Sequence, residues 1–294
     1  MIRGALPVAT FSIVGRDAHN GDLGIAVQSR FLAVGAVVPW AQAGVGAMAV
    51  QSFPDPSYGA KGLALMAAGS TPEEVLETLT REDEGRGVRQ VGVVDAKGQS
   101  ACYTGSDCIG WAGHVSGEDF AAQGNMLVGD RTVEAMAEEF RKSQGPLANR
   151  LMAALAAAQQ AGGDARGKQS AALLVVRERG GFMGLSDRYI DLRVDDHPDP
   201  IKELGRLLEL QRTMHLCVDS ARLAGEGKIE EAIRSMEQAR KREPRDVNVL
   251  YFLARTYFIA GRKDDAMKAL AEACAQHKDI ELLARRDKLL SLDS

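Results

Sequence analysis

Aromatic residues are scarce in this sequence of 294 residues, at 5% of the total, whereas glycine occurs 31 times. A hydrophobic core must therefore be built mainly from alanine, valine, leucine and isoleucine, with many tight backbone turns. The four cysteines do not suggest a disulfide framework in a chain of this length. No segment approaches the roughly 20 consecutive apolar residues of a membrane-spanning helix, and the apolar run at the start is too short for a secretory signal. We therefore expect a cytoplasmic protein with no membrane partner.

A surplus of positive charge is also missing. The formal net charge is -4 and the isoelectric point is about 5.8. Binding to nucleic-acid phosphates needs a basic face, so we expect no nucleic-acid partner. The proportions of hydrophobic (45%) and charged (26%) residues are typical of a soluble globular protein, and the length exceeds that of one average domain.

Short segments with the two-residue periodicity of strands dominate the first 200 residues, and pairs of helical segments separate them. The order is strands, two helices, strands, two helices, strands. This order favours a mainly antiparallel sheet structure with helices on its outer faces. We expect strands over 10–14, 23–29, 35–39, 45–51, 88–95, 99–104, 170–177 and 182–194, and helices over 57–68, from 71 onward, over 131–142 and over 147–161.

A second region begins after the two prolines within residues 195–200, which end regular structure. Beyond a long expected helix over 201–223, small residues recur with a spacing of 34: Gly227 with Gly261, Ala232 with Ala266, and Ala239 with Ala273. This period resembles that of tetratricopeptide repeats over roughly residues 216–276. The pattern predicts an all-α helical-repeat domain over 201–294. Two repeats are fewer than a stable stack normally has, so we expect support from the long helix or from another subunit.

Residues able to bind a metal or cofactor form no convincing motif. Cys102, Cys108 and His114 match no common zinc spacing and lack a fourth ligand. The acidic residues within 195–199 suit a solvated linker, and the glycines of 44–46 lack the rest of a dinucleotide-binding loop. We expect no metal and no cofactor.

No serine–histidine–aspartate order stands out either, although a histidine-based triad stays open. A different nucleophile is suggested by Thr10, at the head of the first expected strand. Such a threonine is its own catalytic unit once the preceding peptide bond is cut, because its freed α-amine serves as the base. An α-amine titrates near pH 7.7 to 8 in its unperturbed state, so it accepts the hydroxyl proton at physiological pH.

Five segments of the chain resemble a bacterial and archaeal family known as domain of unknown function 1028 (DUF1028), which is grouped with the N-terminal-nucleophile (Ntn) hydrolases. They are residues 9–17 (ATFSIVGRD), 21–35 (GDLGIAVQSRFLAVG), 89–95 (RQVGVVD), 123–127 (QGNML) and 187–198 (DRYIDLRVDDHP). The resemblance covers about residues 9–210, with a looser similarity to proteasome β-subunits. It implies an α+β fold, a four-layer αββα sandwich over 10–200, preceded by a leader over 1–9.

The resemblance also implies hydrolysis of a small amide, in which Thr10 attacks the carbonyl and forms an acyl-enzyme ester. Asn125, expected in a glycine-flanked loop, and Gln51 are candidate donors to the oxyanion. Ser29 and Arg30 end the strand expected to pair with the Thr10 strand. There Arg30 would lower the proton affinity of the amine or bind a substrate carboxylate. Asp187 would orient either group. We thus expect Thr10, Asn125 and Arg30 to be catalytic and Ser29, Gln51 and Asp187 to bind substrate.

The chain departs from the family pattern at its start. Family members often begin with Met directly before the threonine, whereas nine residues precede Thr10 here. Either the Ala9–Thr10 bond is cleaved autocatalytically, or the leader stays and blocks the α-amine. The alternative to an amidohydrolase is therefore a non-catalytic protein on the same scaffold that binds a small ligand or another protein.

The helical repeats predict a peptide or protein partner. Positive charge is concentrated there, which would suit an acidic peptide, in Lys228, Arg234, Arg240, Lys241, Arg242 and Arg245. The incomplete repeat stack and the alanine-rich segment 147–161 favour a homodimer over a monomer.

Overall fold

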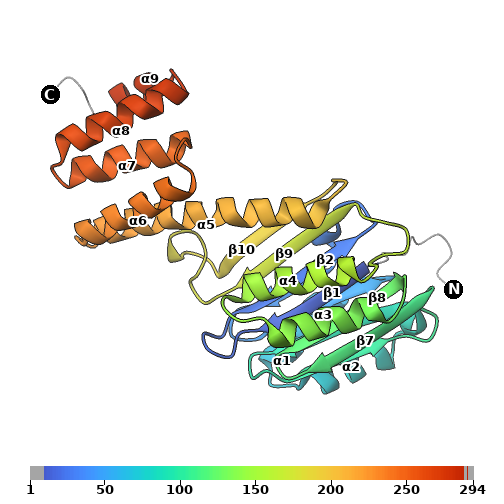
Figure 1. The fold of residues 1–294 in the computed structure, drawn as a ribbon. Coiled ribbons are helices and arrows are strands. Elements are labelled where there is room, and N and C mark those ends of the chain that lie inside the picture. Colours follow the sequence, from blue (N-terminus) through green and yellow to red (C-terminus); the bar gives the residue numbers. More distant parts are fainter. Residues whose placement is uncertain (1–9, 288–289, 291–294) are drawn as a thin grey trace. The chain divides into compact units, whose positions relative to one another are not determined.

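Ten strands of the described residues form two antiparallel sheets (Figure 1). The computed structural model describes residues 10–287 and residue 290, so the predicted leader 1–9 lies outside the described residues. The strands are β1 (Thr10–Arg16), β2 (Leu23–Ser29), β3 (Pro39–Gln42), β4 (Gly46–Ser52), β5 (Arg89–Asp95), β6 (Ser100–Thr104), β7 (Trp111–Gly117), β8 (Phe120–Leu127), β9 (Ser170–Val176) and β10 (Arg188–Val194). One sheet has the order β10-β9-β2-β1-β8-β7, and the other has the order β3-β4-β5-β6.

Helix pairs cover the outer faces of the two sheets. α1 (Ser57–Ala67) and α2 (Pro72–Arg81) pack on the four-stranded sheet, and α3 (Arg131–Lys142) and α4 (Leu147–Gln160) pack on the six-stranded sheet. The inner faces of the sheets contact each other, with β1 against β4 and β5 and with β8 against β5. The predicted element order and the antiparallel pairing are therefore confirmed in an α+β structure. Short 3₁₀ helices η1 (Val34–Ala36), η2 (Arg86–Val88) and η3 (Phe182–Gly184) complete this part.

The N-terminus of the helix predicted from residue 71 onward is capped by local hydrogen bonds. Thr71 Oγ1 accepts a hydrogen bond from the backbone N–H of Glu74, and the Glu74 carboxylate accepts one from the N–H of Thr71. Pro72 occupies the first helical position. These contacts join residues three apart, so the start of this helix depends on local sequence alone.

Two local predictions were wrong, and one hairpin was not predicted. Residues 35–39 form the end of η1 and a connection, and the strand begins only at Pro39. Residues 182–184 form η3, so β10 begins at Arg188. The hairpin of β7 and β8 over 111–127 was not predicted, because its glycines and polar residues obscure the alternation of a strand. Tertiary packing between neighbouring strands overrides this weak local preference.

Apolar side chains fill one half of the space between the sheets. This core joins the inner faces of both sheets through Val14, Leu23, Ile25, Val27, Val34, Val38, Ala47, Ala49, Val94, Ala121, Ala172, Leu174 and Val176. Most of these residues are small or β-branched, as the scarcity of aromatic residues requires. The other half, at the end where β1 begins, is polar.

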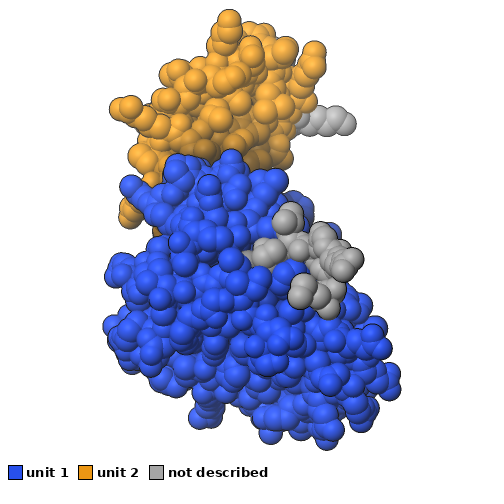
Figure 2. All heavy atoms as spheres, turned by 90° about the vertical axis from the view of Figure 1, so that its right-hand side faces the viewer, with its two compact units in different colours: residues 1–207 blue, residues 208–294 orange. Residues whose placement is uncertain are grey.

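The helices that follow form a second unit, which begins at Leu208 (Figure 2). They are α5 (Pro200–Gly225), α6 (Ile229–Arg242), α7 (Val247–Ile259), α8 (Lys263–Gln276) and α9 (Ile280–Arg286). The division between the units falls inside α5, whereas the sequence predicts a boundary at residue 200. Each helix that the structure describes is too short or too polar to span a bilayer.

The 34-residue spacing has a direct structural counterpart in this unit. Gly227 and Gly261 both adopt positive φ angles, of 78° and 74°, in the turns before α6 and α8. Glycine adopts such angles without steric cost. The repeated alanines are buried where helices cross: Ala232, Ala266, Ala239 and Ala273.

Gly59 on α1 offers a test of how closely the helices pack on the four-stranded sheet. A Cβ atom at Gly59 would lie 2.0 Å from Trp40 Cδ2, and the Trp40 ring is held by a hydrogen bond from Nε1 to Val37 O (3.1 Å). We expect Gly59→Ala to lower the free energy of unfolding by about 1–3 kcal/mol, measured by chemical denaturation. Gly129→Ala is the control, because nothing lies within 4 Å of an added Cβ there. Equal stability of the two variants would contradict the close packing.

Candidate functional site

The strand register brings Thr10 together with two of the other predicted site residues. β1 lies between β2 and β8, and Thr10 is paired with Ser29 on one side and with Asn125 on the other. All three residues are buried. Asn125 lies within β8 and not in the loop that its flanking glycine predicts. The β7–β8 hairpin therefore determines its position.

Gln51 approaches the same place from the opposite sheet. Its Nε2 atom lies 3.4 Å from the backbone oxygen of Thr10, and its Oε1 atom accepts a hydrogen bond from Ser12 Oγ at 2.6 Å. Ser12 is two residues after Thr10 on β1, so the two side chains share the face that packs on the four-stranded sheet. The stacking of the sheets thus adds Gln51 to the group formed by strand pairing.

Five neutral side chains form a continuous hydrogen-bonded group here, which we call the amide network: Ser12, Gln51, Gln90, Gln123 and Asn125. Gln90 Oε1 accepts hydrogen bonds from Gln51 Nε2 at 2.8 Å and from Asn125 Nδ2 at 3.0 Å. Gln123 Nε2 donates to Ser12 Oγ at 2.6 Å. All five residues are buried. Because an unsatisfied buried polar group costs about 1–3 kcal/mol, these side chains depend on one another.

Gln90 and Gln123 are members that the sequence analysis did not identify. A signal was present, because each glutamine interrupts a strand of apolar and small residues. Their convergence could not be predicted, since it requires knowing which strands face each other. Gly92 leaves the space for Gln123, because a Cβ at Gly92 would lie 2.0 Å from Gln123 Oε1.

Strained backbone accompanies the two candidate oxyanion donors. Ser52 directly follows Gln51 and has a φ of 69°, and Met126 directly follows Asn125 and has a φ of 52°. A residue with a side chain costs about 1–2 kcal/mol in the left-handed region. Such strain is often found at functional sites. The two strands thus end in unusual conformations at the same end of the domain.

Arg30 lies at the rim of this end, with an exposed side chain. Its Nη1 atom donates to the backbone oxygen of Lys168 (2.9 Å), and its backbone N–H donates to Asp164 Oδ2 (3.0 Å). Asp164 is buried and also forms an ion pair with Arg166. Arg30, Arg166 and Lys168 therefore lie near the end of β2 and the start of β9, and Lys168 forms an ion pair with Asp199 at 3.0 Å.

Asp187 does not lie near Thr10 and the side chains around it. Next to it, Arg188 pairs with Val176, which pairs in turn with Leu23 at the start of β2. Ser29 and Thr10 lie at the other end of the same strands, about 20 Å away at the usual rise per residue. Asp187 is exposed and accepts a hydrogen bond from the backbone N–H of Arg179. The predicted orienting role is incompatible with this position, because the β9–β10 connection lies at the wrong end of the sheet.

The residues considered for zinc have separate partners. Cys102 Sγ lies 3.8 Å from Gln123 Oε1, Cys108 Sγ lies 3.5 Å from the backbone oxygen of Arg89, and His114 Nδ1 lies 2.8 Å from Thr104 Oγ1. Over the part of the chain that the structure describes, no three His, Cys, Asp or Glu side chains converge as metal ligands would.

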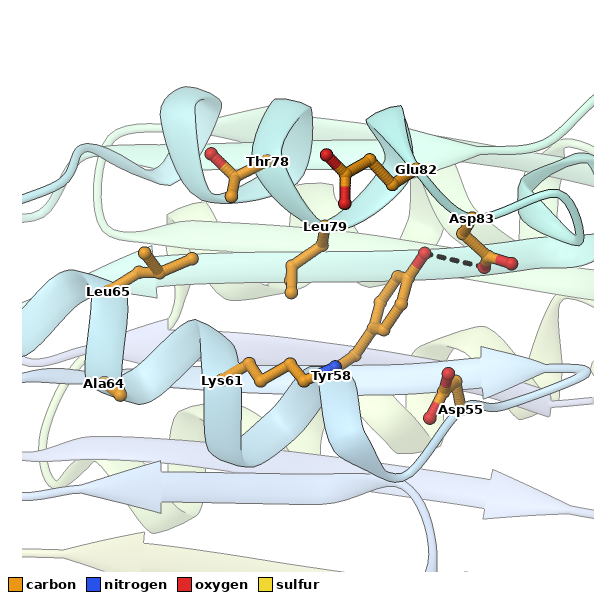
Figure 3. A pocket seen from close by; sticks show the side chains of 9 residues that line it. All are labelled: Asp55, Tyr58, Lys61, Ala64, Leu65, Thr78, Leu79, Glu82 and Asp83. Carbon is orange, nitrogen blue, oxygen red and sulfur yellow. Dashed lines mark hydrogen bonds between the residues drawn. The ribbon is translucent and has the colours of Figure 1, made fainter.

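A groove of about 710 Å³ lies between α1 and α2, on the outer side of the four-stranded sheet (Figure 3). The ring of Tyr58 stands between the helices, and its hydroxyl donates to Asp83 Oδ2 at 2.7 Å. Burial and the Asp83 carboxylate raise the pKa of Tyr58 well above its usual value. Arg89, next to Gln90 on β5, forms an ion pair with the same carboxylate at 2.8 Å. Successive side chains of a strand point to opposite faces of the sheet, so Arg89 points toward the groove and Gln90 points toward the space between the sheets. The groove and the amide network therefore lie on opposite sides of the four-stranded sheet.

These features define the class of protein: a two-sheet α+β domain with a polar site between its sheets, followed by helical repeats. A model of DUF1028, a family of unknown function, matches residues 10–204, and the chain belongs to this family. A tetratricopeptide-repeat model matches residues 223–285. The resemblances to DUF1028 and to tetratricopeptide repeats are thereby confirmed.

Among solved structures, the chain is similar to the crystal structure of a DUF1028 protein from Silicibacter pomeroyi. The two are 34% identical, with a TM-score of 0.63, and the match covers 68% of this chain and 88% of that chain. No curated protein matches the chain.

The thiol of Cys102 provides a test of how well the site excludes solvent. Burial raises the pKa of Cys102 to about 12, so about one thiol in 10,000 is ionised at pH 8. We expect iodoacetamide at pH 8 to leave Cys102 unmodified in the native protein and to modify it after unfolding, as followed by peptide mass mapping. Cys274 on α8, whose thiol pKa is raised less by burial, serves as the internal control. Modification of both at equal rates would show that the space between the sheets is open.

Proposed function

We propose that the sheet domain is an Ntn-type hydrolase of a small amide, with the four-layer αββα sandwich of that class and Thr10 as its nucleophile. The observation that carries the proposal is the position of Thr10 at the head of the central strand β1, beside Ser29, Asn125 and Gln51. The strained residues after Gln51 and Asn125 support it. Thr10 would need a free α-amine, because the surrounding amide network holds no general base.

The first step in this proposal is maturation of the chain. Thr10 Oγ1 attacks the carbonyl carbon of Ala9, and the acyl group moves from nitrogen to oxygen to form an ester. Water then hydrolyses the ester, so that Ala9 leaves with a carboxylate and Thr10 keeps its α-amine and hydroxyl. The amine is the base for the next reaction.

The second step is hydrolysis of the substrate. Thr10 Oγ1 loses its proton to the α-amine and attacks the substrate carbonyl, and Asn125 Nδ2 stabilises the oxyanion with the hydrogen that it does not donate to Gln90. Such a donor typically contributes about 3–4 kcal/mol. The amine product leaves with a proton, and water releases the acyl group from Thr10. Ser29 contacts substrate, and Arg30 at the rim binds a carboxylate on it.

Intact-mass analysis and N-terminal sequencing of the purified protein test the proposal. We expect incubation at neutral pH to remove residues 1–9, and a β-lactone probe then to add its mass at Thr10. Thr10→Ala removes the hydroxyl and should abolish both events, whereas Thr10→Ser keeps the hydroxyl and should retain them. Cleavage of Thr10→Ala at the wild-type rate would refute the assignment.

The second candidate is a binding protein on the same scaffold. It is favoured by the network itself, in which Gln51 and Gln90 already donate and accept within the protein. A chain that keeps residues 1–9 after long incubation, and is stabilised by a ligand that it does not convert, would support this function instead.

We also propose that the helical repeats bind a protein partner and that the cytoplasmic protein is a homodimer. Several basic residues of the repeats form ion pairs within the unit: Lys228 with Glu226, Arg240 with Glu272, and Arg242 with Glu209. Arg234, Lys241 and Arg245 form no ion pair within the described residues and favour an acidic peptide. Light scattering would reveal a monomer if the dimer is wrong.

A further inference from the structure

The side-chain amide of Gln90 has an orientation that the backbone determines. Its Nε2 atom lies 2.7 Å from the backbone oxygen of Gly124, 3.2 Å from that of Gly113 and 3.0 Å from Thr104 Oγ1. Backbone carbonyls only accept hydrogen bonds, so this end of the amide must be the NH₂ group. Gln90 Oε1 must then accept from whatever faces it.

The orientation of the Gln90 amide constrains the orientation of the side chains that are hydrogen-bonded to it. Gln51 and Asn125 have to present NH₂ groups to Gln90 Oε1. Gln51 Oε1 therefore faces Ser12 and accepts its hydroxyl proton, and Ser12 Oγ in turn accepts from Gln123. The Gln90 amide, held by two backbone carbonyls, thus sets the direction of the hydrogen bond from Asn125, and together with the backbone oxygen of Thr10 it sets the orientation of Gln51.

We propose that Gln90 is a positioning residue for the Thr10 site, an inference that rests on the proposed hydrolase function. Together with the backbone oxygen of Thr10, which lies 3.4 Å from Gln51 Nε2, it holds the NH₂ group of Gln51 toward Thr10. It also leaves Asn125 with one free Nδ2 hydrogen and with an Oδ1 atom that is buried and has no partner among the described residues. The free hydrogen serves an oxyanion, and Oδ1 accepts from the α-amine of Thr10 once that amine is released.

Reversal of the Gln90 amide would be harmful for a specific reason. Gln51 and Asn125 would each turn an oxygen toward Gln90 and rearrange the groups that face Thr10. An oxygen in place of Asn125 Nδ2 would repel the negative charge that develops during attack. The carbonyls of Gly113 and Gly124 prevent this reversal without any charged residue.

Three variants test the inference. Gln90→Met keeps an unbranched side chain of similar size but removes both the donor and the acceptor. Gln90→Glu keeps an acceptor oxygen for Gln51 and Asn125. Thr104→Val is the matched control, because it removes a partly buried contact of Gln90 while both backbone carbonyls still hold the amide.

Two readouts separate positioning from chemistry. The first is the rate of Ala9–Thr10 cleavage, measured by intact mass. The second is the hydrogen–deuterium exchange rate of the Asn125 side-chain amide, measured by NMR and assigned by its loss in Asn125→Asp. We expect Gln90→Met to slow cleavage at least tenfold and to speed exchange at least tenfold. Gln90→Glu should lie between Gln90→Met and wild type, and Thr104→Val should match wild type in both.

The outcomes are distinguishable. The positioning role is refuted if Gln90→Met melts cooperatively and keeps the wild-type rates of cleavage and exchange. It is also refuted if Thr104→Val is as impaired as Gln90→Met. In both cases Thr10 can still be active. If wild type never cleaves, the hydrolase function fails, and the exchange rates still decide whether Gln90 orients Asn125. If Gln90→Met does not fold, Gln90→Glu tests the positioning role instead. Cleavage and exchange rates between those of wild type and complete loss are expected for Gln90→Glu, and wild-type rates in that variant would refute the positioning role.

Discussion

Buried amide side chains between two packed sheets must satisfy one another, and the arrangement at the head of β1 depends on this constraint. Gln90 donates to two backbone oxygens of other strands and accepts from two other amides of the network, whereas Gln51 has one backbone oxygen as a partner, at 3.4 Å. Its hydrogen bonds join β5 of one sheet to β8 of the other. The same contacts that satisfy buried polar groups therefore also hold the two sheets in one relative position.

Division of the space between the sheets into an apolar half and a polar half follows from this arrangement. The apolar half consists mainly of alanine, valine and leucine, which pack without directional preference. The polar half has a directional preference at every contact, because each hydrogen bond needs a donor and an acceptor. Gly92 of the facing sheet leaves the space that the Gln123 side chain occupies while it donates to Ser12 on the neighbouring strand. A network without charge suits the proposed hydrolase, in which the α-amine of Thr10 would supply the base.

The repeat unit follows a different principle. Its core comes from helix faces that repeat every 34 residues, with alanines at the helix crossings and Tyr251, Tyr257 and Leu253 filling the space between them. Neighbouring contacts dominate such a stack, so each helix pair depends mainly on the next. Local sequence therefore predicts this unit better than it predicts the sheets.

The sequence by itself determined the features that depend on near neighbours: the start of α2 at Thr71, the pairing of Thr10 with Ser29 across a short turn, and the 34-residue repeat. It also placed Thr10 at the head of a strand. Only the tertiary structure decided that Asn125 lies on a strand, that Asp187 lies at the far end of the sheet, and that Gln90 and Gln123 join the site. The physical reason is separation along the chain. The hydrogen bond from Gln123 to Ser12, 111 residues apart, depends on which strands pair, and the one from Asn125 to Gln90, 35 residues apart, depends on which sheets stack. No local periodicity records either choice.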